Sequence, residues 1–291
     1  MKLLVTGASG FLGSRHTTLL RERGHEVVAV TRPRGRPRAG ADALAALELD
    51  AGHPAARELI AGCHAVLHFA GVPDPATALA DPATAIRENV GTTLNLLEGC
   101  AEHGAALIYP STVRAAQDPP PDPYAMSKRL GEQACRLHSA PSVVARMTSV
   151  FGPGQVRAEG ATGAIAVFAA RALEGEPIVI PGDPSRTRDF VFVDDVVAAL
   201  ESLVAERRFG QTVTLGSGVA TPLVKAARLV IGAAGSSSPI ETPGGELAPG
   251  ENESYETGTR LLFPARPLAE AVQLYVDWLR SHPAVKGSAR A

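Results

Sequence analysis

The chain has 291 residues, a formal net charge of −2 from 28 basic and 30 acidic residues, and three cysteines. Such a charge balance gives no indication of a protein that binds nucleic acids or membrane surfaces by electrostatics, so we expect a small-molecule substrate, with no nucleic-acid and no membrane partner. The widely spaced cysteines predict reduced thiols. The N-terminus lacks a signal-peptide pattern, and no apolar run reaches the roughly 18 residues that a membrane span needs, so we expect a cytoplasmic protein.

Three glycines separate the first predicted strand, Lys2 to Val5, from a helix predicted over Ser14 to Arg23. They are Gly7, Gly10 and Gly13. Because glycine has no Cβ, the backbone of such a turn can approach a pyrophosphate, and the free N–H groups of the helix N-terminus face the anion. The pattern G-x-x-G-x-x-G therefore predicts a dinucleotide site. The alternative is an ordinary strand-to-helix turn of an α/β protein.

The second predicted strand, Glu26 to Thr31, ends without an acidic residue. In a Rossmann unit, Asp or Glu at this place accepts a hydrogen bond from the ribose of NAD, whereas a neutral residue followed by arginine suits the 2′-phosphate of NADP. Here Thr31 occupies the place, and Arg32 begins an arginine-rich loop that ends at Gly40. We therefore favour NADP over NAD. The alternative is that these arginines belong to a solvated surface loop.

Further strands are predicted at Leu47 to Asp50, Ala65 to Ala70 and Ala105 to Tyr109, with a helix over Ala85 to His103 between the last two. This repeated β-α-β pattern predicts an α/β protein with a Rossmann-type, doubly wound parallel sheet that is covered by helices on both faces. In such sheets the ligand binds at the carboxyl ends of the strands. Side chains that follow these strands are therefore the candidates for chemistry.

Hydroxyl groups of Ser111 and Thr112 follow the fifth predicted strand, and Tyr124 and Lys128 then share one face of a helix. A phenol with its usual pKa of about 10 is a poor base, but a neighbouring ammonium and a positive nicotinamide ring both favour the phenolate. Tyr124 could then exchange a proton with a substrate near neutral pH. Alone, Y-x-x-x-K also fits a surface helix with a half-buried tyrosine. Behind five β-α units and a glycine turn, it indicates a catalytic pair.

Two histidines, His64 and His68, stand four apart near the fourth predicted strand. No acid and no third histidine completes a zinc set, so we expect no metal site. Both are predicted to be core histidines.

The second half of the chain carries weaker patterns, and residues 232–254, rich in Gly, Ser, Pro and Glu, are expected to form a loop. The predicted strands here are Ser142 to Met147, Pro177 to Ile180, Phe190 to Val193 and Thr212 to Leu215. The predicted helices are Ile165 to Leu173, Asp194 to Ala205 and Leu268 to Leu279.

Taken together, several motifs resemble those of the extended short-chain dehydrogenase/reductase family, the NAD-dependent epimerases and dehydratases that modify nucleotide sugars. The resembling stretches are TGASGFLG at 6–13, HFAG at 68–71, PST at 110–112, YAMSK at 124–128, RMTSVFGPG at 146–154 and RDFVFVDD at 188–195. The resemblance implies an NAD(P)-binding Rossmann domain over residues 1–147 and a mainly sugar-nucleotide-binding domain over 148–291. It allows the helix and strand of 194–216 to return to the first sheet.

The resemblance also implies roles for single residues. Thr112 matches the catalytic Ser or Thr that bonds the reacting sugar oxygen, Tyr124 the acid/base, and Lys128 the ligand of the cofactor ribose. Ser149 and Arg188 match substrate-binding positions, together with Thr112. The implied cofactor-binding residues are Gly7, Gly10, Phe11, Leu12, Gly13, Thr31, Arg32, Asp50, Phe69, Ala70, Gly71, Asn89, Ser111, Tyr124 and Lys128.

Alternatives stay open at two of these positions. Asn89 also fits an ordinary polar residue on a helix face. Arg188, which matches an arginine that contacts the diphosphate of the sugar nucleotide, could instead pair with Asp189 or Asp183.

Departures from the family pattern narrow the predicted reaction. Val113 and Arg114 stand where family dehydratases carry an Asp-Glu pair, so a 4,6-dehydratase is not expected, because eliminating water requires an extra acid and base. Ser149 replaces a frequent asparagine and Pro73 a frequent lysine, so the sugar pocket is altered.

We therefore predict an NAD(P)-dependent oxidoreductase that transfers hydride at a carbon, C4 by expectation, of a nucleoside-diphosphate sugar. The missing acid at Thr31 favours a 4-ketoreductase. The alternatives are a 4-epimerase that works by transient oxidation and, in another class, a non-catalytic NADP-binding sensor. Family analogy suggests a homodimer through the helices of Asn89 and Tyr124.

Overall fold

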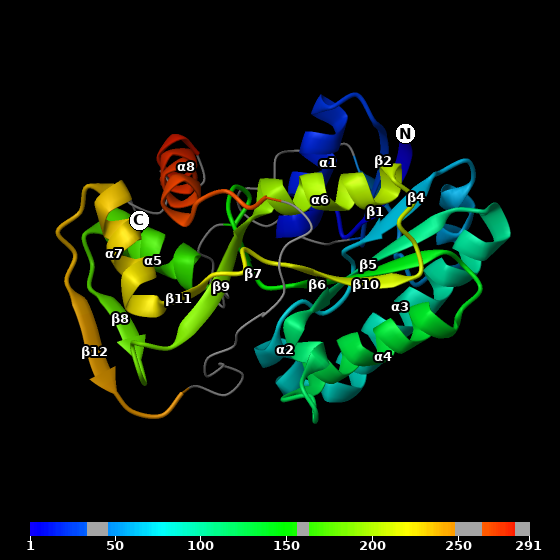
Figure 1. Cartoon of the computed structure of the whole chain (residues 1–291). Coiled ribbons are helices and arrows are strands. Elements are labelled where there is room, and N and C mark those ends of the chain that lie inside the picture. Colours follow the sequence, from blue (N-terminus) through cyan, green and yellow to red (C-terminus); the bar gives the residue numbers. More distant parts are fainter. Residues whose placement is uncertain (34–45, 156–162, 248–263, 283–291) are drawn as a thin grey trace. The chain divides into compact units, whose positions relative to one another are not determined.

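The computed structural model describes residues 1–33, 46–155, 163–247 and 264–282 (Figure 1). The chain divides into two compact units. The first comprises Met1–Met147 and Val197–Leu215, and the second Thr148–Val196 and Gly216–Ala291. Within the described ranges, no helix has both the length and the apolar character needed to cross a membrane.

The first unit is built on a seven-stranded parallel sheet in the order β10-β6-β5-β4-β1-β2-β3. This arrangement confirms the predicted Rossmann-type sheet. The strands are β1 (Lys2–Thr6), β2 (Glu26–Thr31), β3 (Leu47–Glu48), β4 (Ala65–His68), β5 (Ala106–Thr112), β6 (Ser142–Met147) and β10 (Gln211–Leu215). Strand β10 pairs in parallel with β6, so the chain returns to this sheet after residues of the second unit.

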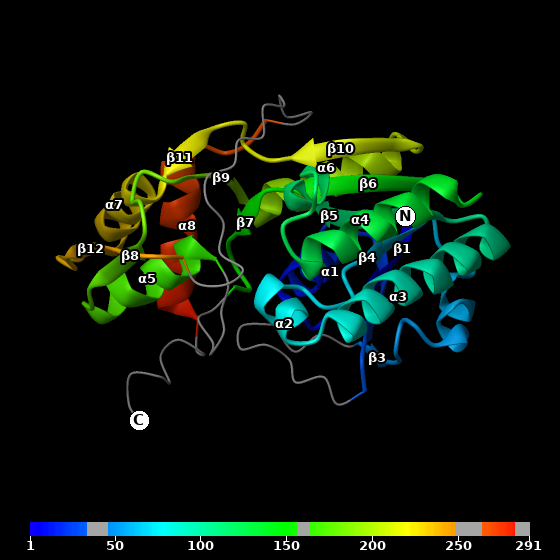
Figure 2. The same ribbon diagram turned by 90° about the horizontal axis from the view of Figure 1, so that it is seen from below.

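Helices cover both faces of the sheet, as the crossover connections of parallel strands require. Helices α3 and α4 lie on one face and α1 on the other (Figure 1), and the view from below shows α3 and α4 side by side (Figure 2). The helices are α1 (Phe11–Glu22), α2 (Pro75–Ala80), α3 (Pro82–His103), α4 (Pro123–Leu137) and, shared by both units, α6 (Val193–Ala205). Asp and Pro begin α2, α3 and α4, where the carboxylate caps free N–H groups and the proline has no N–H to satisfy.

The core under α3 and α4 is formed by apolar residues of the sheet and of these two helices. It includes Leu4, Val66, Leu107, Tyr109, Leu96, Leu97 and the three cysteines Cys63, Cys100 and Cys135. All three thiols are buried and free. Burial raises the pKa of Cys100 and Cys135 to about 12, so these thiols are protonated and pack as small apolar groups.

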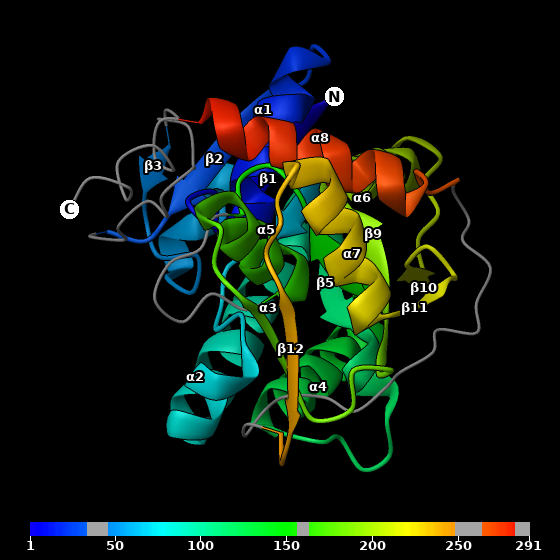
Figure 3. The ribbon, with the colours of Figure 1, turned by 90° about the vertical axis from the view of Figure 1, so that its left-hand side faces the viewer.

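The described residues of the second unit form two small sheets with helices packed beside them (Figure 3). One sheet has the order β11-β9-β7 and the other pairs β12 with β8. The strands are β7 (Ser149–Phe151), β8 (Ile178–Pro181), β9 (Thr187–Phe192), β11 (Ala220–Pro222) and β12 (Ile240–Gly244), and the helices are α5 (Ala164–Glu174), α7 (Leu223–Ala234) and α8 (Leu268–Ser281). Phe151, Phe190 and Tyr275 lie in its core.

Some elements of the second half were not predicted. The expected loop over 232–254 is wrong for its described part, because α7 extends to Ala234 and β12 pairs with β8. Residues 248–254 of that loop lie outside the described ranges. Strands β7 and β11 have three residues each, too few to show a hydrophobic period.

Candidate active site

The glycine turn after β1 is closed to side chains at two positions. Gly7 has a φ of +65°, and a Cβ added to it would lie 2.6 Å from the carbonyl carbon of Phe69. A Cβ on Gly13 would lie 2.2 Å from the carbonyl oxygen of Gly7. The Gly10 N–H donates to the same oxygen at 2.9 Å. The backbone of Gly7 therefore packs directly on the segment after β4, and the start of α1 at Gly13 packs directly on Gly7.

The N-terminus of α1 carries no capping side chain. Gly10 is its N-cap, Phe11 and Leu12 are its first residues, and its first turn has no acidic residue. The N–H groups of a first helical turn have no partner within the helix, and they carry the positive end of the helix dipole. Such a start, reached through glycines that leave room for close approach, fits the pyrophosphate of a dinucleotide.

At the end of β2, both residues of the cofactor prediction have protein partners. Thr31 Oγ1 donates to Ser9 Oγ of the glycine turn at 2.7 Å. Arg32 Nη1 pairs with Glu88 Oε2 on α3 at 2.9 Å, and both side chains are partly exposed. Arg34, Arg36 and Arg38 lie outside the described residues. Within the described residues, the arginine on which the prediction of NADP depends, Arg32, is therefore already paired with Glu88.

The segment after β4 is fixed by Asn89. Its Oδ1 accepts from the Val72 N–H at 2.7 Å, and its Nδ2 donates to Val72 O at 3.2 Å and to Ser127 Oγ at 2.8 Å. A Cβ on Gly71, whose φ is +135°, would lie 2.3 Å from Asn89 Oδ1. Asn89 thus joins this segment to α4, which supports a positioning role.

Other implied cofactor residues lie around the same strand ends. The Ala70 N–H donates to Thr6 Oγ1 at 3.2 Å, and the Phe69 ring lies 4.4 Å from the ring of His16. Asp50 Oδ1 accepts from the Gly52 N–H at 2.8 Å. All of these residues belong to the first unit.

His68 is a buried core histidine, as predicted. Its Nδ1 lies 3.0 Å from Thr6 Oγ1 and its Nε2 lies 3.2 Å from Thr93 Oγ1. Burial first, and then the Lys128 charge, lower the pKa of His68 to about 3, so the ring is neutral. For His64 the core prediction is wrong: it precedes β4 and is exposed. No group of three His, Cys, Asp or Glu residues within the described ranges could hold a metal ion.

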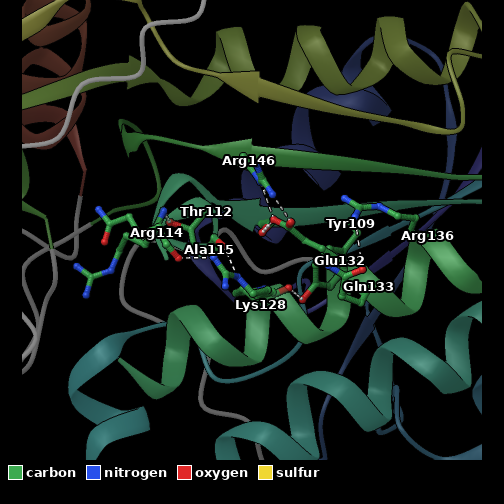
Figure 4. A network of polar contacts seen from close by, with 12 residues as sticks. Tyr109, Thr112, Arg114, Ala115, Lys128, Glu132, Gln133, Arg136 and Arg146 are labelled. Atoms are coloured by element: carbon green, nitrogen blue, oxygen red, sulfur yellow. Dashed lines mark hydrogen bonds and ion pairs between the residues drawn. The ribbon is translucent and has the colours of Figure 1, made fainter. Parts of the chain in front are cut away.

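Strand β5 ends in the two hydroxyl residues that were predicted to act. Thr112 Oγ1 accepts from the Arg114 N–H at 3.3 Å and caps the short 3₁₀ helix Val113–Ala116. Ser111 Oγ donates to Glu132 Oε1 on α4 at 2.5 Å. Figure 4 shows Thr112, Lys128 and Glu132 along the facing sides of β5 and α4. The Ser111 proton is therefore committed to a carboxylate, while its lone pairs remain as acceptors.

Helix α4 carries Tyr124 and Lys128 one turn apart. Lys128 Nζ donates to Pro110 O at 3.0 Å and lies 5.1 Å from the centre of the Tyr109 ring. Burial lowers the pKa of Lys128 to about 8, against Cys135 and Glu132, which raise it. The ammonium form still predominates at neutral pH and faces the end of β5.

Tyr124 packs against Val72, Ala78 and Ala85. Burial raises the pKa of its phenol to about 12. The cation that lowers this pKa in the structure is Arg114, whereas the expectation named Lys128. In the free chain Tyr124 is therefore protonated at neutral pH.

Two ion pairs near the ends of β5 and α4 were not predicted: Glu132 with Arg146, and Arg114 with Asp122. Two signals in the sequence point to them. Glu132 stands four residues after Lys128 on the same helix face, and Asp122 before Pro123 is an N-cap signature. Arg114 and Arg146 had no such local signal, because their partners stand 8 and 14 residues away on other elements, outside any helical spacing.

Ser149 and Arg188 lie on neighbouring strands of the second unit. Ser149 on β7 pairs with Phe190 of β9, and Arg188 Nη1 donates to Thr187 O at 2.8 Å. The adjacent carboxylate of Asp189 is buried and accepts from the N–H groups of Ser217 and Gly218, at 2.6 and 2.9 Å. These bonds fix the chain after β10.

Comparison with known proteins agrees with this architecture. The sequence model of the NAD dependent epimerase/dehydratase family matches residues 3–216. A dTDP-glucose 4,6-dehydratase of Streptomyces griseus is 28% identical, over 96% of this chain and 94% of its own length. The UDP-glucose 4-epimerase of Thermotoga maritima, solved with UDP-glucose, is 27% identical with a TM-score of 0.82, over 96% of this chain and 99% of that chain. MoeE5 in complex with UDP-glucose and NAD gives the same identity, TM-score and coverage.

Proposed function

Because the chain belongs to the NAD-dependent epimerase/dehydratase family, a family of enzymes, we propose that it moves hydride at C4 of a nucleoside-diphosphate sugar. The observation that carries the proposal is the placement of Tyr124 and Lys128 one turn apart on α4, beside the end of β5 where Thr112 lies. Parallel strands expose their carboxyl ends at one edge, and the glycine turn follows β1 at that same edge.

In this proposal, separate groups of residues bind the cofactor, bind the sugar and transfer the proton. The Gly7–Gly13 turn and the first N–H groups of α1 hold the pyrophosphate, and Lys128 bonds the cofactor ribose. Thr112 bonds the sugar oxygen, and Tyr124 transfers the proton to or from it. When bound, the dinucleotide supplies the hydride donor or acceptor.

Reduction of a 4-keto sugar is our first candidate for the net reaction. The Tyr124 phenol is protonated in the free chain, and reduction of a ketone requires a proton donor. The end of β2 offers Thr31 and no carboxylate, which favours NADPH as the hydride donor.

Epimerisation at C4 by transient oxidation is the second candidate. It is favoured by the likeness of the whole chain to UDP-glucose 4-epimerase of Thermotoga maritima.

The choice between NAD and NADP is also open to test. Two observations favour NAD: the ion pair of Arg32 with Glu88, and the NAD bound by MoeE5. Thr31, a neutral residue at the end of β2, favours NADP. The substrate is proposed to be a nucleoside-diphosphate sugar.

A panel of nucleotide sugars tests these candidates. The purified chain is incubated with intact and 4-keto sugars, with NADH or NADPH present or omitted. Stoichiometric loss of the reduced cofactor indicates the reductase, and isomerisation without net consumption indicates the epimerase. NADP binding without any turnover would support the sensor instead.

The variant Tyr124→Phe tests the mechanism. We expect turnover to fall by at least about 100-fold, because the proton donor is lost, while dinucleotide binding and the circular-dichroism spectrum stay unchanged. Near-full turnover in this variant would contradict the role of Tyr124.

We also propose a homodimer through α3 and α4. Leu94 on α3 and Met126 and Leu130 on α4 are large apolar side chains that are exposed in the single chain. Light scattering after gel filtration should give twice the mass of the chain, and Leu130→Glu should shift it towards the monomer.

A further inference from the structure

Two buried charges flank the link between the strand that carries Thr112 and the helix that carries Tyr124. Arg114 follows β5, and Asp122 is the N-cap of α4. The Arg114 guanidinium forms an ion pair with the Asp122 carboxylate, and the exposed fractions of the two side chains are only 8% and 3%. Figure 4 shows Arg114 beside Thr112 at the end of the polar network. Burying two charges is costly, so the pair must be held by further contacts.

Asp122 and Arg114 are each tied to one of the catalytic elements. Asp122 Oδ1 accepts from the Ala125 N–H at 2.8 Å, which fixes the first turn of α4 at Tyr124. The Arg114 N–H donates to Thr112 Oγ1 at 3.3 Å. The ion pair therefore connects the candidate proton-transfer residue to the candidate substrate-bonding hydroxyl.

We propose that the Arg114–Asp122 pair is a positioning device that fixes Tyr124 at the start of α4, with the two charges of the pair acting in opposite directions on its side chain. This inference rests on the proposed function of Tyr124. It assigns a role to the residue that stands where the dehydratase pattern has an acidic pair.

The charges around Tyr124 agree with opposite effects of the two partners. Burial is the largest influence and raises the pKa of Tyr124; Arg114 lowers it, while Asp122 and Asp74, which precedes α2, raise it. Two further titratable groups stand on the neighbouring elements: Tyr109 on β5, whose buried phenol interacts electrostatically with Tyr124, and Lys128 one turn along α4. Helices α2 and α3 contribute the apolar groups Ala78 and Ala85 to this environment. The Arg114–Asp122 pair contributes one charge of each sign, so substitution of one partner or the other should move the pKa of Tyr124 in opposite directions.

The test is a direct titration of the Tyr124 phenol, followed by NMR in protein labelled with carbon-13 tyrosine. Tyr124→Phe identifies its signal among the four tyrosines of the chain. Asp122→Asn keeps an N-cap but removes the negative charge, and it should lower the midpoint by about one pH unit. Arg114→Met should raise the midpoint, and Arg114→Lys should restore it towards the wild-type value.

Arg129→Gln is the matched control. Arg129 on α4 donates to Ala115 O at 2.8 Å and so ties the same 3₁₀ helix to α4, but it does not act on the Tyr124 phenol. We expect its midpoint to equal that of the wild type. If Arg114→Met fails to fold, the neutral double variant Arg114→Met/Asp122→Asn replaces it, with a midpoint above that of Asp122→Asn alone.

An unchanged midpoint in Asp122→Asn would overturn the proposal. So would shifts of Asp122→Asn and Arg114→Met in the same direction, because loosening of the helix start would move both alike. The titration uses the chain without cofactor or substrate. Failure of the proposed function would appear separately, as absent turnover in a chain whose midpoints still shift.

Discussion

Glu132 and Arg146 join helix α4 to strand β6 through a buried carboxylate. Arg146 Nε donates to Oε1 at 2.9 Å and Nη2 to Oε2 at 2.5 Å, while Ser111 Oγ donates to the same Oε1. Glu132 is 1% exposed (Figure 4). The carboxylate therefore binds three elements together, β5, β6 and α4, directly behind Thr112 and one turn beyond Lys128.

Glu132→Gln should destabilise the chain by about 2 kcal/mol, because the amide NH2 group would face the Arg146 Nη2 donor and the guanidinium would lose its carboxylate partner. The free energy of unfolding in urea measures this loss. The matched control is Glu26→Gln, which removes an exposed carboxylate 3.8 Å from Lys2 Nζ and should change stability by less than about 0.5 kcal/mol. Equal effects of the two variants would contradict the role of the buried network.

His68 should make stability depend on pH. Its pKa falls from 6.5 in the unfolded chain to about 3 in the fold, so below pH 6.5 the unfolded state binds a proton that the folded state refuses. The contribution of the neutral His68 ring to the free energy of unfolding is complete above pH 6.5, the pKa in the unfolded chain, and is lost as the pH falls towards 3. The stability difference between wild type and His68→Asn should shrink by at most about 1.4 kcal/mol per pH unit below pH 6.

Urea unfolding between about pH 7 and about pH 4 measures this dependence. A pH-independent difference for His68→Asn would mean that the buried ring is not held neutral.

Two glycine-to-alanine substitutions, one in the glycine turn and one on α3, should have opposite effects on stability. Gly13→Ala would place a Cβ 2.2 Å from Gly7 O, which should cost about 1–3 kcal/mol of stability and at least about tenfold in dinucleotide affinity. Gly91→Ala on α3 meets no atom within 4 Å and should stabilise the chain by about 1 kcal/mol. Calorimetric titration with NAD and thermal unfolding give both quantities. Unchanged NAD affinity in Gly13→Ala would place the pyrophosphate elsewhere.

The ion pair of Arg32 with Glu88 offers a test of cofactor choice. Glu88→Gln should release Arg32 and raise the affinity for NADP relative to NAD by about two- to tenfold, since a 2′-phosphate gains an unengaged guanidinium. Arg32→Gln should move the ratio the other way. Ratios that stay constant in both variants would show that Arg32 does not reach the adenosine ribose.

Much of the first unit follows from local patterns. The predicted strand Ser142 to Met147 coincides with β6, and the helix predicted over Ala85 to His103 lies within α3. These segments are buried runs or long amphipathic helices with caps, so their periodicity is strong. The second unit was harder, because strands of three residues such as β7 and β11 form only where a distant partner supplies the hydrogen bonds.

The candidate site shows the same division. By itself, the sequence determined the glycine turn, the hydroxyls after β5 and the Tyr124–Lys128 pair, because close backbone approach and helical spacing are encoded within a few neighbouring residues. Only the tertiary structure decided that Arg114 meets Asp122, that Glu132 meets Arg146 and that Arg32 meets Glu88. Burial and the charge of partners on other elements set these pairings and the proton affinity of Tyr124, and neither quantity is a property of a local pattern.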